Sequence, residues 1–283
     1  MRQGRVDKVI MGVLWASGML FLLGIVLFPF YYMVMASFKP ALQLQAAPAD
    51  LSLSWEQLTN LSAYLDVWQN QGIGRYFFNS AYVSSLTTLL TLILATFGAY
   101  AVARLRFPGR QFMSKSILLI YLFPAVVIVI PLYVIFSKVG LRDSLNGLII
   151  VYLAQTLPVA IYMLDSYFRT LPKDLEEAGI IDGCTRFSVI CRITLPLSLP
   201  ALTSVGLYTF MIAWNEFLFA LLFLDDTRIM TLPRGIQTIA NSIDLSPQLL
   251  MAAAVVTTLP VIVLFLAFER FLVKGLTSGG VKG

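Results

Sequence analysis

The chain has 283 residues, of which 58% are hydrophobic and 12% are charged, whereas soluble domains are typically about 45–50% apolar and about 25% charged. These proportions exclude an ordinary soluble domain and indicate a membrane protein. The net charge of +5 comes from basic residues that flank apolar segments and form no stripe on a folded domain, which argues against a nucleic-acid partner.

Six charge-free windows reach the length of about 20 residues that crosses the hydrocarbon core of a membrane. They are Val9–Phe38, Tyr76–Ala103, Ser116–Ser137, Ser144–Leu164, Ile193–Asn215 and Leu245–Phe268. The first window is longer than the apolar region of a secretory signal, which is about 7–15 residues, so we expect it to stay in the mature protein. The sequence therefore predicts an all-α membrane protein with six transmembrane helices.

Basic residues are unevenly shared between the two faces that six spans create. Fourteen of the 20 lysines and arginines lie before the first span, in the second and fourth connections, and after the last span. By the positive-inside rule this face is cytoplasmic, and both termini are expected there. The predicted organisation is a cytoplasmic N-terminus (1–8), a transmembrane domain (9–272) with external loops 39–75 and 225–249 and a cytoplasmic loop 165–200, and a cytoplasmic tail (273–283).

The first external loop contains an apolar pattern of its own. Leu58, Leu61, Leu65 and Trp68 recur at helical spacing after a run that contains two prolines. Tryptophan and tyrosine favour the headgroup level of a bilayer. We therefore expect an interfacial helix in this loop.

The cytoplasmic loop 165–200 contains the stretch TLPKDLEEAGIIDGC. Proline suits the start of a helix, and the acidic residues that follow it favour the positive N-terminal end of the helix dipole. Gly183 supplies a left-handed residue past the helix end. The pattern predicts a short helix, a turn at Gly183, and a second short helix from Thr185.

One face of the first short helix is formed by Leu175, Ala178, Gly179 and Asp182, which share it by their spacing. Its apolar part is small and flat, so a partner could approach the backbone closely. Two interpretations remain open from these residues alone: a docking helix, or a well-capped surface turn.

Metal and disulfide chemistry have little support in the sequence. The chain has no histidine, and its two cysteines, Cys184 and Cys191, lie in the loop assigned to the reducing cytoplasm. We predict no metal site and no disulfide.

Polar side chains inside the predicted spans are candidates for a solute pathway. They are Asn79, Tyr82, Gln155, Asn215 and Glu216. A carboxylate at midspan costs about 2.5–3.5 kcal/mol on insertion scales, so Glu216 requires a polar neighbour. Each residue can line a path for a polar solute or hydrogen-bond neighbouring helices, and small polar residues commonly do the latter.

The cytoplasmic loop also carries a recognisable signature. The spacing of Glu177, Ala178 and Gly179, then Gly183, then Ile193, Leu195 and Pro196 resembles the E-A-A loop of permease subunits in binding-protein-dependent ABC importers. One position departs from that pattern, because Gly179 stands where the family usually has alanine, a substitution that costs about 1 kcal/mol within a helix. Other stretches, AYAVARLRFPGR, AWNEFLFALLF and GLTSGGVKG, are similar to the carbohydrate branch of that family, on the side of the second maltose permease subunit.

The resemblance implies a type I importer permease fold and a role for each part of the loop. It implies that the signature is a coupling helix seated in a groove of an ATPase subunit, with Glu177 paired to a basic residue there. The implied coupling residues are Glu177, Ala178, Gly179, Asp182, Gly183, Ile193, Leu195 and Pro196. The tail, with Gly279, Gly280 and Lys282, resembles the extension that reaches between the ATPase subunits.

The implied partners are a second permease subunit in a heterodimer, two ABC ATPase subunits, an extracytoplasmic solute-binding protein and membrane lipid, in a bacterial or archaeal plasma (inner) membrane. The chain lacks the phosphate-binding motif G-x-x-x-x-G-K-[ST], so we expect it to be non-catalytic and free of cofactors, with ATP and Mg²⁺ held by the partner ATPase. The implied cargo is a sugar or related polar solute, most simply an oligosaccharide.

Three alternative functions compete with this interpretation. A glycerol-phosphate ABC permease fits the same signature. An ion-driven secondary transporter is expected to carry more intramembrane acids and paired discontinuous helices. A membrane enzyme lacks support because the chain has no histidine, metal cluster or paired acids.

Overall fold

The computed structural model describes residues 3–120, 124–241 and 246–280, and throughout these ranges the regular elements are helices. The chain divides into two units, Met1–Gly72 with Thr238–Thr258, and Ile73–Gln237 with Leu259–Gly283. Within the described residues, four segments are long and apolar enough to cross a membrane: Ile10–Phe38, Ile73–Arg104, Leu145–Phe168 and Pro247–Glu269. A bent pair, Arg186–Leu197 and Leu199–Asn215, makes a fifth if it is counted as one span.

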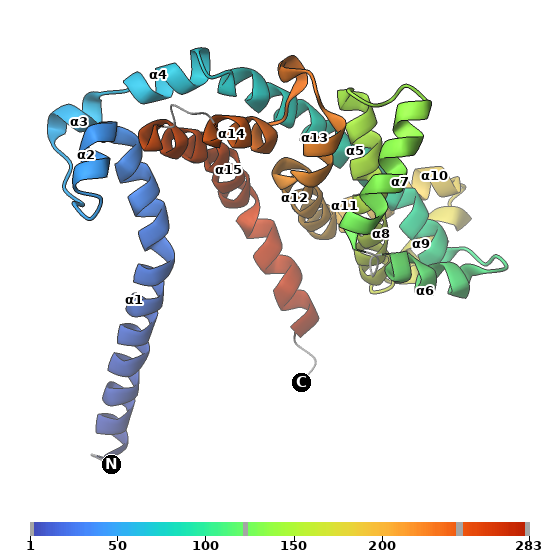
Figure 1. Ribbon diagram of the computed structural model, residues 1–283. Coiled ribbons are helices and arrows are strands. Elements are labelled where there is room, and N and C mark those ends of the chain that lie inside the picture. Colours follow the sequence, from blue (N-terminus) through green and yellow to red (C-terminus); the bar gives the residue numbers. More distant parts are fainter. Residues whose placement is uncertain (1–2, 121–123, 242–245, 281–283) are drawn as a thin grey trace. The chain divides into compact units, whose positions relative to one another are not determined.

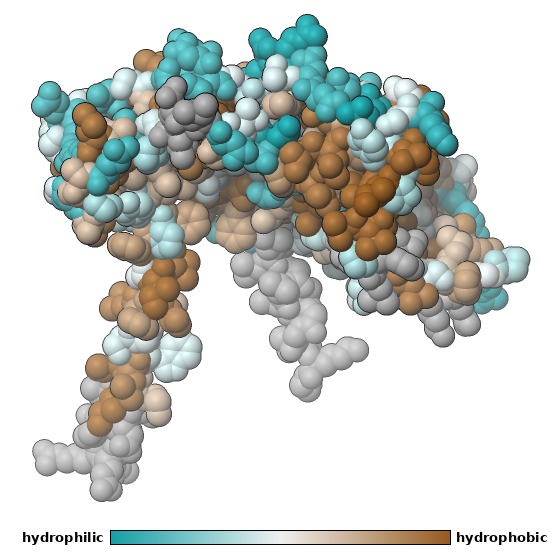
Figure 2. All heavy atoms as spheres, in the orientation of Figure 1, coloured by the Kyte–Doolittle hydropathy of each residue, from teal (hydrophilic) through white to brown (hydrophobic). Residues whose placement is uncertain are grey.

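The first unit is built on α1 (Gln3–Phe38), a single 36-residue helix (Figure 1). Its side chains from Ile10 to Tyr31 are exposed and mostly hydrophobic, as Figure 2 shows along its length. The predicted first span and the observed helix α1 both end at Phe38. Such a bare apolar surface is stable only when lipid or another apolar surface covers it.

The segment after α1, which is predicted to be external, forms three short helices, α2 (Ala41–Ala46), α3 (Trp55–Thr59) and α4 (Ser62–Gln69). The expected single helix is thus divided in two, because Asn60 ends α3 and its side chain accepts from the backbone N–H of Ser62 at 3.0 Å. Ser54 and Gln57 form a reciprocal capping box that starts α3.

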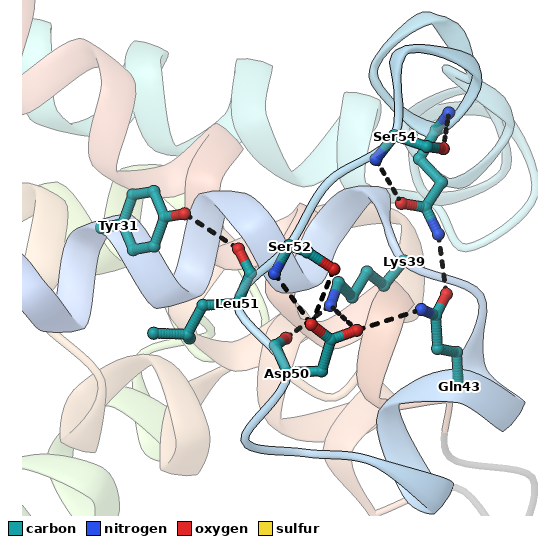
Figure 3. A network of polar contacts seen from close by, with 8 residues as sticks. Tyr31, Lys39, Gln43, Asp50, Leu51, Ser52 and Ser54 are labelled. Carbon is teal, nitrogen blue, oxygen red and sulfur yellow. Dashed lines mark hydrogen bonds and ion pairs between the residues drawn. The ribbon is translucent and has the colours of Figure 1, made fainter.

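A polar network fixes the segment after α1 to the end of that helix (Figure 3). The Lys39 ammonium is fully buried, donates to the backbone carbonyl of Asp50 and lies 3.0 Å from its carboxylate. The Ser52 hydroxyl and backbone N–H donate to the same carboxylate at 2.7 and 2.9 Å. Tyr31 donates to the Leu51 carbonyl at 3.0 Å. A buried cation requires such partners, so the network fixes the course of the loop.

These contacts lower the pKa of Asp50 below its usual value of 3.8, chiefly through the two hydrogen bonds from Ser52 and then through Lys39. Because the folded pKa is the lower one, the contribution of the carboxylate to stability is fully present above pH 3.8 and is lost only as the pH falls through the folded value.

We expect Asp50→Asn to loosen residues 40–54 at neutral and mildly acidic pH, because Lys39 loses its counter-charge. Hydrogen exchange of these amides in the purified assembly is the measurement, and several-fold faster exchange is expected. Glu56→Gln removes an exposed carboxylate from the same segment and is the matched control. Equal protection in the two variants would contradict a role for the ion pair.

The second unit is organised around three long helices, α5 (Ile73–Arg104), α8 (Leu145–Phe168) and α12 (Leu199–Asn215), which pack against one another. One apolar cluster includes Val83, Leu148, Tyr152 and Phe223, and a second includes Ala95, Ala160, Leu164 and Val205. These clusters form the hydrophobic core of this unit.

Hydroxyl side chains also lie in this helix interface. Ser80, Ser84, Thr87 and Thr91 recur on one face of α5 and are all buried. The hydroxyls of Thr91 and Thr156 of α8 are 2.9 Å apart. This arrangement is the interhelical packing that small polar residues commonly supply in membranes.

The predicted third span, 116–137, differs from the structure. It is divided into α6 (Arg110–Ile120) and α7 (Ala125–Lys138), with Pro124 as the residue before α7. Residues 121–123 lie outside the described residues. Pro124 itself is not helical, and because proline lacks a backbone N–H it is well suited to the position just before α7.

The last helix, α15 (Pro247–Gly280), runs into the predicted tail. Gly279 and Gly280 are its final two residues, and Lys282 lies outside the described residues. The remaining elements are α9 (Lys173–Ile181), α10 (Arg186–Val189), η1 (Ile190–Thr194), α11 (Leu195–Leu197), α13 (Leu218–Phe223), η2 (Thr227–Ile229) and α14 (Leu232–Ala240).

Candidate functional site

Loop 165–200, which the sequence predicts to be cytoplasmic, forms the expected short helix. Helix α9 begins after Pro172, carries Asp174 and Glu176 in its first turn and ends at Ile181. Gly183 has a φ of +85°, and the backbone N–H of Cys184 donates to the Gly179 carbonyl at 2.9 Å. The predicted glycine stop is therefore confirmed, and its cause is the left-handed conformation that glycine adopts without steric cost.

The second short helix also begins as predicted. Thr185 accepts from the backbone N–H of Ser188 at 3.2 Å and so caps α10. The chain then continues through the π-helix η1 and α11 before it bends by 82° into α12. The charge-free window Ile193–Asn215 therefore contains a bend, and its straight part is α12, which begins at Leu199.

Most of the predicted coupling residues lie on the outward side of this loop. Glu177, Ala178, Asp182, Gly183 and Pro196 are exposed, whereas Ile193 and Leu195 are half-buried. Large apolar side chains accompany them: Ile181 is 85% exposed and Leu175 is 47% exposed. An exposed acid beside exposed apolar side chains is the composition of a docking surface.

Gly179 is the exception, since it is buried on the opposite side of α9. A Cβ atom at this position would lie 2.7 Å from Cδ1 of Ile193 and 3.6 Å from Cγ2 of Val189. The departure from alanine in the signature therefore has a packing reason, because the glycine admits the Ile193 side chain against α9.

Glu176 is the second residue that faces inward, and it is only 6% exposed. Its carboxylate accepts from Arg104 Nε at 3.0 Å, from the Tyr100 hydroxyl at 3.2 Å and from the Thr194 hydroxyl at 3.4 Å. Arg104 Nη2 donates to the Leu171 carbonyl at 3.0 Å. Breaking a buried pair by removing one partner typically costs about 3–5 kcal/mol.

The sequence analysis predicted neither the ion pair between Arg104 and Glu176 nor the exposed side chain of Ile181. Arg104 and Glu176 are 72 positions apart in the chain, and nothing local in the sequence indicates that they meet. The sequence did contain a hint of the exposed Ile181. Two adjacent isoleucines are unusual in a segment predicted to lie outside the membrane, unless a partner covers one of them.

Glu216 lies at the break between α12 and α13, and its carboxylate joins these two helices to α8. It follows the last residue of α12, and its carboxylate accepts from the Tyr152 hydroxyl of α8 at 2.7 Å. It also accepts from the backbone N–H groups of Phe219 and Ala220 of α13 at 2.9 and 3.2 Å. These three donors are the hydrogen-bond partners that a buried carboxylate requires.

The other candidate pathway residues lie in different surroundings. Asn79 donates to the carbonyls of Arg228 and Met230 at 3.1 and 2.9 Å, so its amide holds the external loop. Tyr82 and Asn215 are exposed. The side-chain oxygen of Gln155 is buried and has no hydrogen-bond partner among the described residues.

The first turn of α14 contacts α5 at two further points. Ser80 Oγ accepts from the backbone N–H of Leu232 at 2.7 Å. A Cβ atom at Gly235 of α14 would lie 2.1 Å from the ring of Tyr76. The α14 backbone therefore packs directly on an aromatic ring.

We expect Gly235→Ala to destabilise the protein by about 1–3 kcal/mol, because overpacking forces the Tyr76 ring or α14 to move. The thermal unfolding midpoint of the purified assembly is the measurement. Gly206→Ala is the matched control, since its Cβ atom would find an ordinary contact at 3.5 Å with Leu92. Equal midpoints for the two variants would contradict the close packing.

Comparison with known proteins identifies the chain. Residues 88–278 match the model of the family described as binding-protein-dependent transport system inner membrane component. The chain is 41% identical to the inner membrane ABC transporter permease protein YcjP of Escherichia coli K12, over 94% of this chain and 95% of that protein. It is 36% identical to the trehalose/maltose transport system permease protein MalG of Thermococcus litoralis, over 98% of this chain and 99% of that one.

The fold is also similar to a solved structure. A chain of a bacterial ABC transporter involved in the import of the acidic polysaccharide alginate superposes with a TM-score of 0.79 at 21% identity, covering 96% of this chain and 98% of that one. Together these matches show a multi-pass inner-membrane permease fold and set aside the ion-driven and enzymatic alternatives. The chain belongs to the family of binding-protein-dependent transport system inner membrane components.

Proposed function

We propose that this chain and a second permease subunit form the membrane pathway of an ATP-driven importer, with both termini in the cytoplasm. Two ABC ATPase subunits hold ATP and Mg²⁺ and hydrolyse the nucleotide, so this chain itself performs no catalysis. An extracytoplasmic binding protein delivers the solute to the external loops.

The outward face of α9 is the observation that carries the proposal. Glu177, Ala178, Asp182 and Ile181 are exposed in a loop whose opposite side packs on the membrane helices. This face supplies an acid for a basic partner residue and apolar area for a groove. In the proposed assembly the tail with Gly279, Gly280 and Lys282 makes a separate contact, between the two ATPase subunits.

The proposed cargo is an oligosaccharide or a related sugar. The support is that one relative is named for trehalose and maltose, while the chain has exposed polar and aromatic side chains in its membrane helices, such as Tyr82 and Asn215. Sugars are bound by hydroxyl, amide and aromatic groups of this kind.

Reconstitution in liposomes tests the proposal. The chain is co-expressed with its neighbouring permease, ATPase and binding-protein genes, and uptake of labelled maltose, trehalose and glycerol 3-phosphate is measured with and without ATP. We expect ATP-dependent uptake of a sugar and co-purification of the ATPase. Uptake driven by an ion gradient without ATP would contradict the proposal that ATP is the energy source. Uptake of glycerol 3-phosphate alone would contradict the proposal that the cargo is a sugar.

A further inference from the structure

Two adjacent glutamates of α9 face opposite ways. Glu177 is exposed on the outward face, whereas Glu176 is buried against α5 and η1. Successive helical residues are separated by about 100° around the axis, so neighbouring residues can face a partner and the protein body. The two carboxylates therefore have different roles.

The carboxylate of Glu176 joins α9 to two other elements at once. Arg104 and Tyr100 belong to the last turns of α5, and Thr194 belongs to η1, which leads into the bend before α12. We call Tyr100, Arg104, Glu176 and Thr194 the α5–α9 joint. The side chains of Arg104 and Glu176 are 5% and 8% exposed, so water does not screen this ion pair.

The position of α9 relative to α5 depends on this joint. Arg104 also donates to the Leu171 carbonyl in the segment just before α9, so one guanidinium holds both the helix and its entry. Gly179 is the other buried residue of α9. It has no side chain, so it contributes only an apolar backbone contact with Ile193. A buried, charge-assisted hydrogen bond such as that from Arg104 Nε to Glu176 is directional, whereas an apolar contact can slide.

We propose that Glu176 and Arg104 are the positioning pair that transfers displacement of α9 to α5. This inference rests on the proposed docking of the outward face of α9 to an ATPase. A partner that moves α9 moves the end of α5 with it, and α5 packs against α8 and α12, which form the core of the second unit. Without the pair, α9 still docks, but its movement reaches the bundle incompletely.

The test compares Glu176→Ala with Asp174→Ala in the reconstituted complex. Asp174 is an exposed acid on the same helix and has no part in the joint, so it controls for loss of one negative charge from α9. Three quantities are measured: ATPase co-purification, ATP hydrolysis stimulated by loaded binding protein, and solute uptake. We expect Glu176→Ala to retain the ATPase and hydrolysis but to raise the ATP consumed per solute about tenfold, within the range for residues of a coupling network.

Two further variants keep the inference testable if Glu176→Ala is poorly folded. Glu176→Gln retains the shape and one acceptor, and we expect a smaller rise in the same ratio. The double variant Arg104→Glu with Glu176→Arg restores opposite charges, and we expect it to recover part of the coupling that Arg104→Glu alone loses.

The outcomes separate this inference from the proposed function. An unchanged ratio of ATP to solute in Glu176→Ala and Glu176→Gln, equal to that of Asp174→Ala, overturns the inference while the docking proposal stands. Loss of ATPase co-purification in both Glu176 variants also overturns it, because the residue would then act in assembly. If no ATPase co-purifies with the wild-type chain, the docking proposal fails and this inference fails with it.

Discussion

Glu177→Ala is expected to weaken association with the ATPase by about 2 kcal/mol or more, which is at least about thirtyfold in affinity. The reason is the desolvation that docking imposes. A carboxylate that pairs with a basic residue in a closed groove leaves that residue buried and unpaired when it is removed. Uptake should fall with association, because hydrolysis can act on the pathway only through a bound partner.

Pull-down of the ATPase with the tagged chain measures this effect, alongside uptake in the same membranes. Asp174→Ala is again the control, since both acids are exposed and lie in the same helix. Membrane insertion should be equal in wild type and both variants, because neither side chain packs inside the protein. Wild-type pull-down and wild-type uptake for Glu177→Ala would rule out the proposed pairing.

Glu216→Ala is expected to destabilise the second unit by about 3 kcal/mol or more, because three donors lose their acceptor and each buried unsatisfied group costs about 1–3 kcal/mol. The donors are the Tyr152 hydroxyl and the backbone N–H groups of Phe219 and Ala220. Thermal unfolding of the purified assembly is the measurement.

Tyr152→Phe is the companion variant, because it removes one donor and leaves the carboxylate with its two backbone partners. A loss of about 1 kcal/mol is expected for it, the usual net value of one hydrogen bond. Glu216→Gln separates the two interpretations of the residue. If Glu216→Gln keeps the wild-type midpoint and loses uptake, Glu216 acts on the solute; a wild-type midpoint for Glu216→Ala would contradict its role in joining the helices.

Local signals in the sequence were sufficient for the parts of this protein that depend on local chemistry. The end of α9 at Gly183 and the start of α10 at Thr185 follow from the backbone freedom of glycine and the capping hydroxyl of threonine. The long apolar windows that became α1, α5 and α8 follow from the thickness of a bilayer. The signature in the cytoplasmic loop identified the family.

Helix continuity was less predictable, because hydropathy reports composition and not backbone geometry. The window 116–137 is apolar throughout, yet Pro124 separates α6 from α7. The window from Ile193 is equally apolar, yet the chain bends by 82° before Leu199. Prolines were visible in both windows, but a proline inside a membrane helix can also be accommodated without a break, as at Pro158 in α8.

The sequence by itself determined that this is a multi-pass membrane permease with a short acidic helix in loop 165–200, because apolar length and motif spacing are properties of contiguous residues. Only the tertiary structure decided which glutamate of that helix faces outward and which is buried on Arg104, that Gly179 packs close to the Ile193 side chain, and that Glu216 joins α12 and α13 to α8. Those outcomes depend on side chains brought together from distant parts of the chain, and their free energy comes from desolvation and pairing that exist only after the helices have packed.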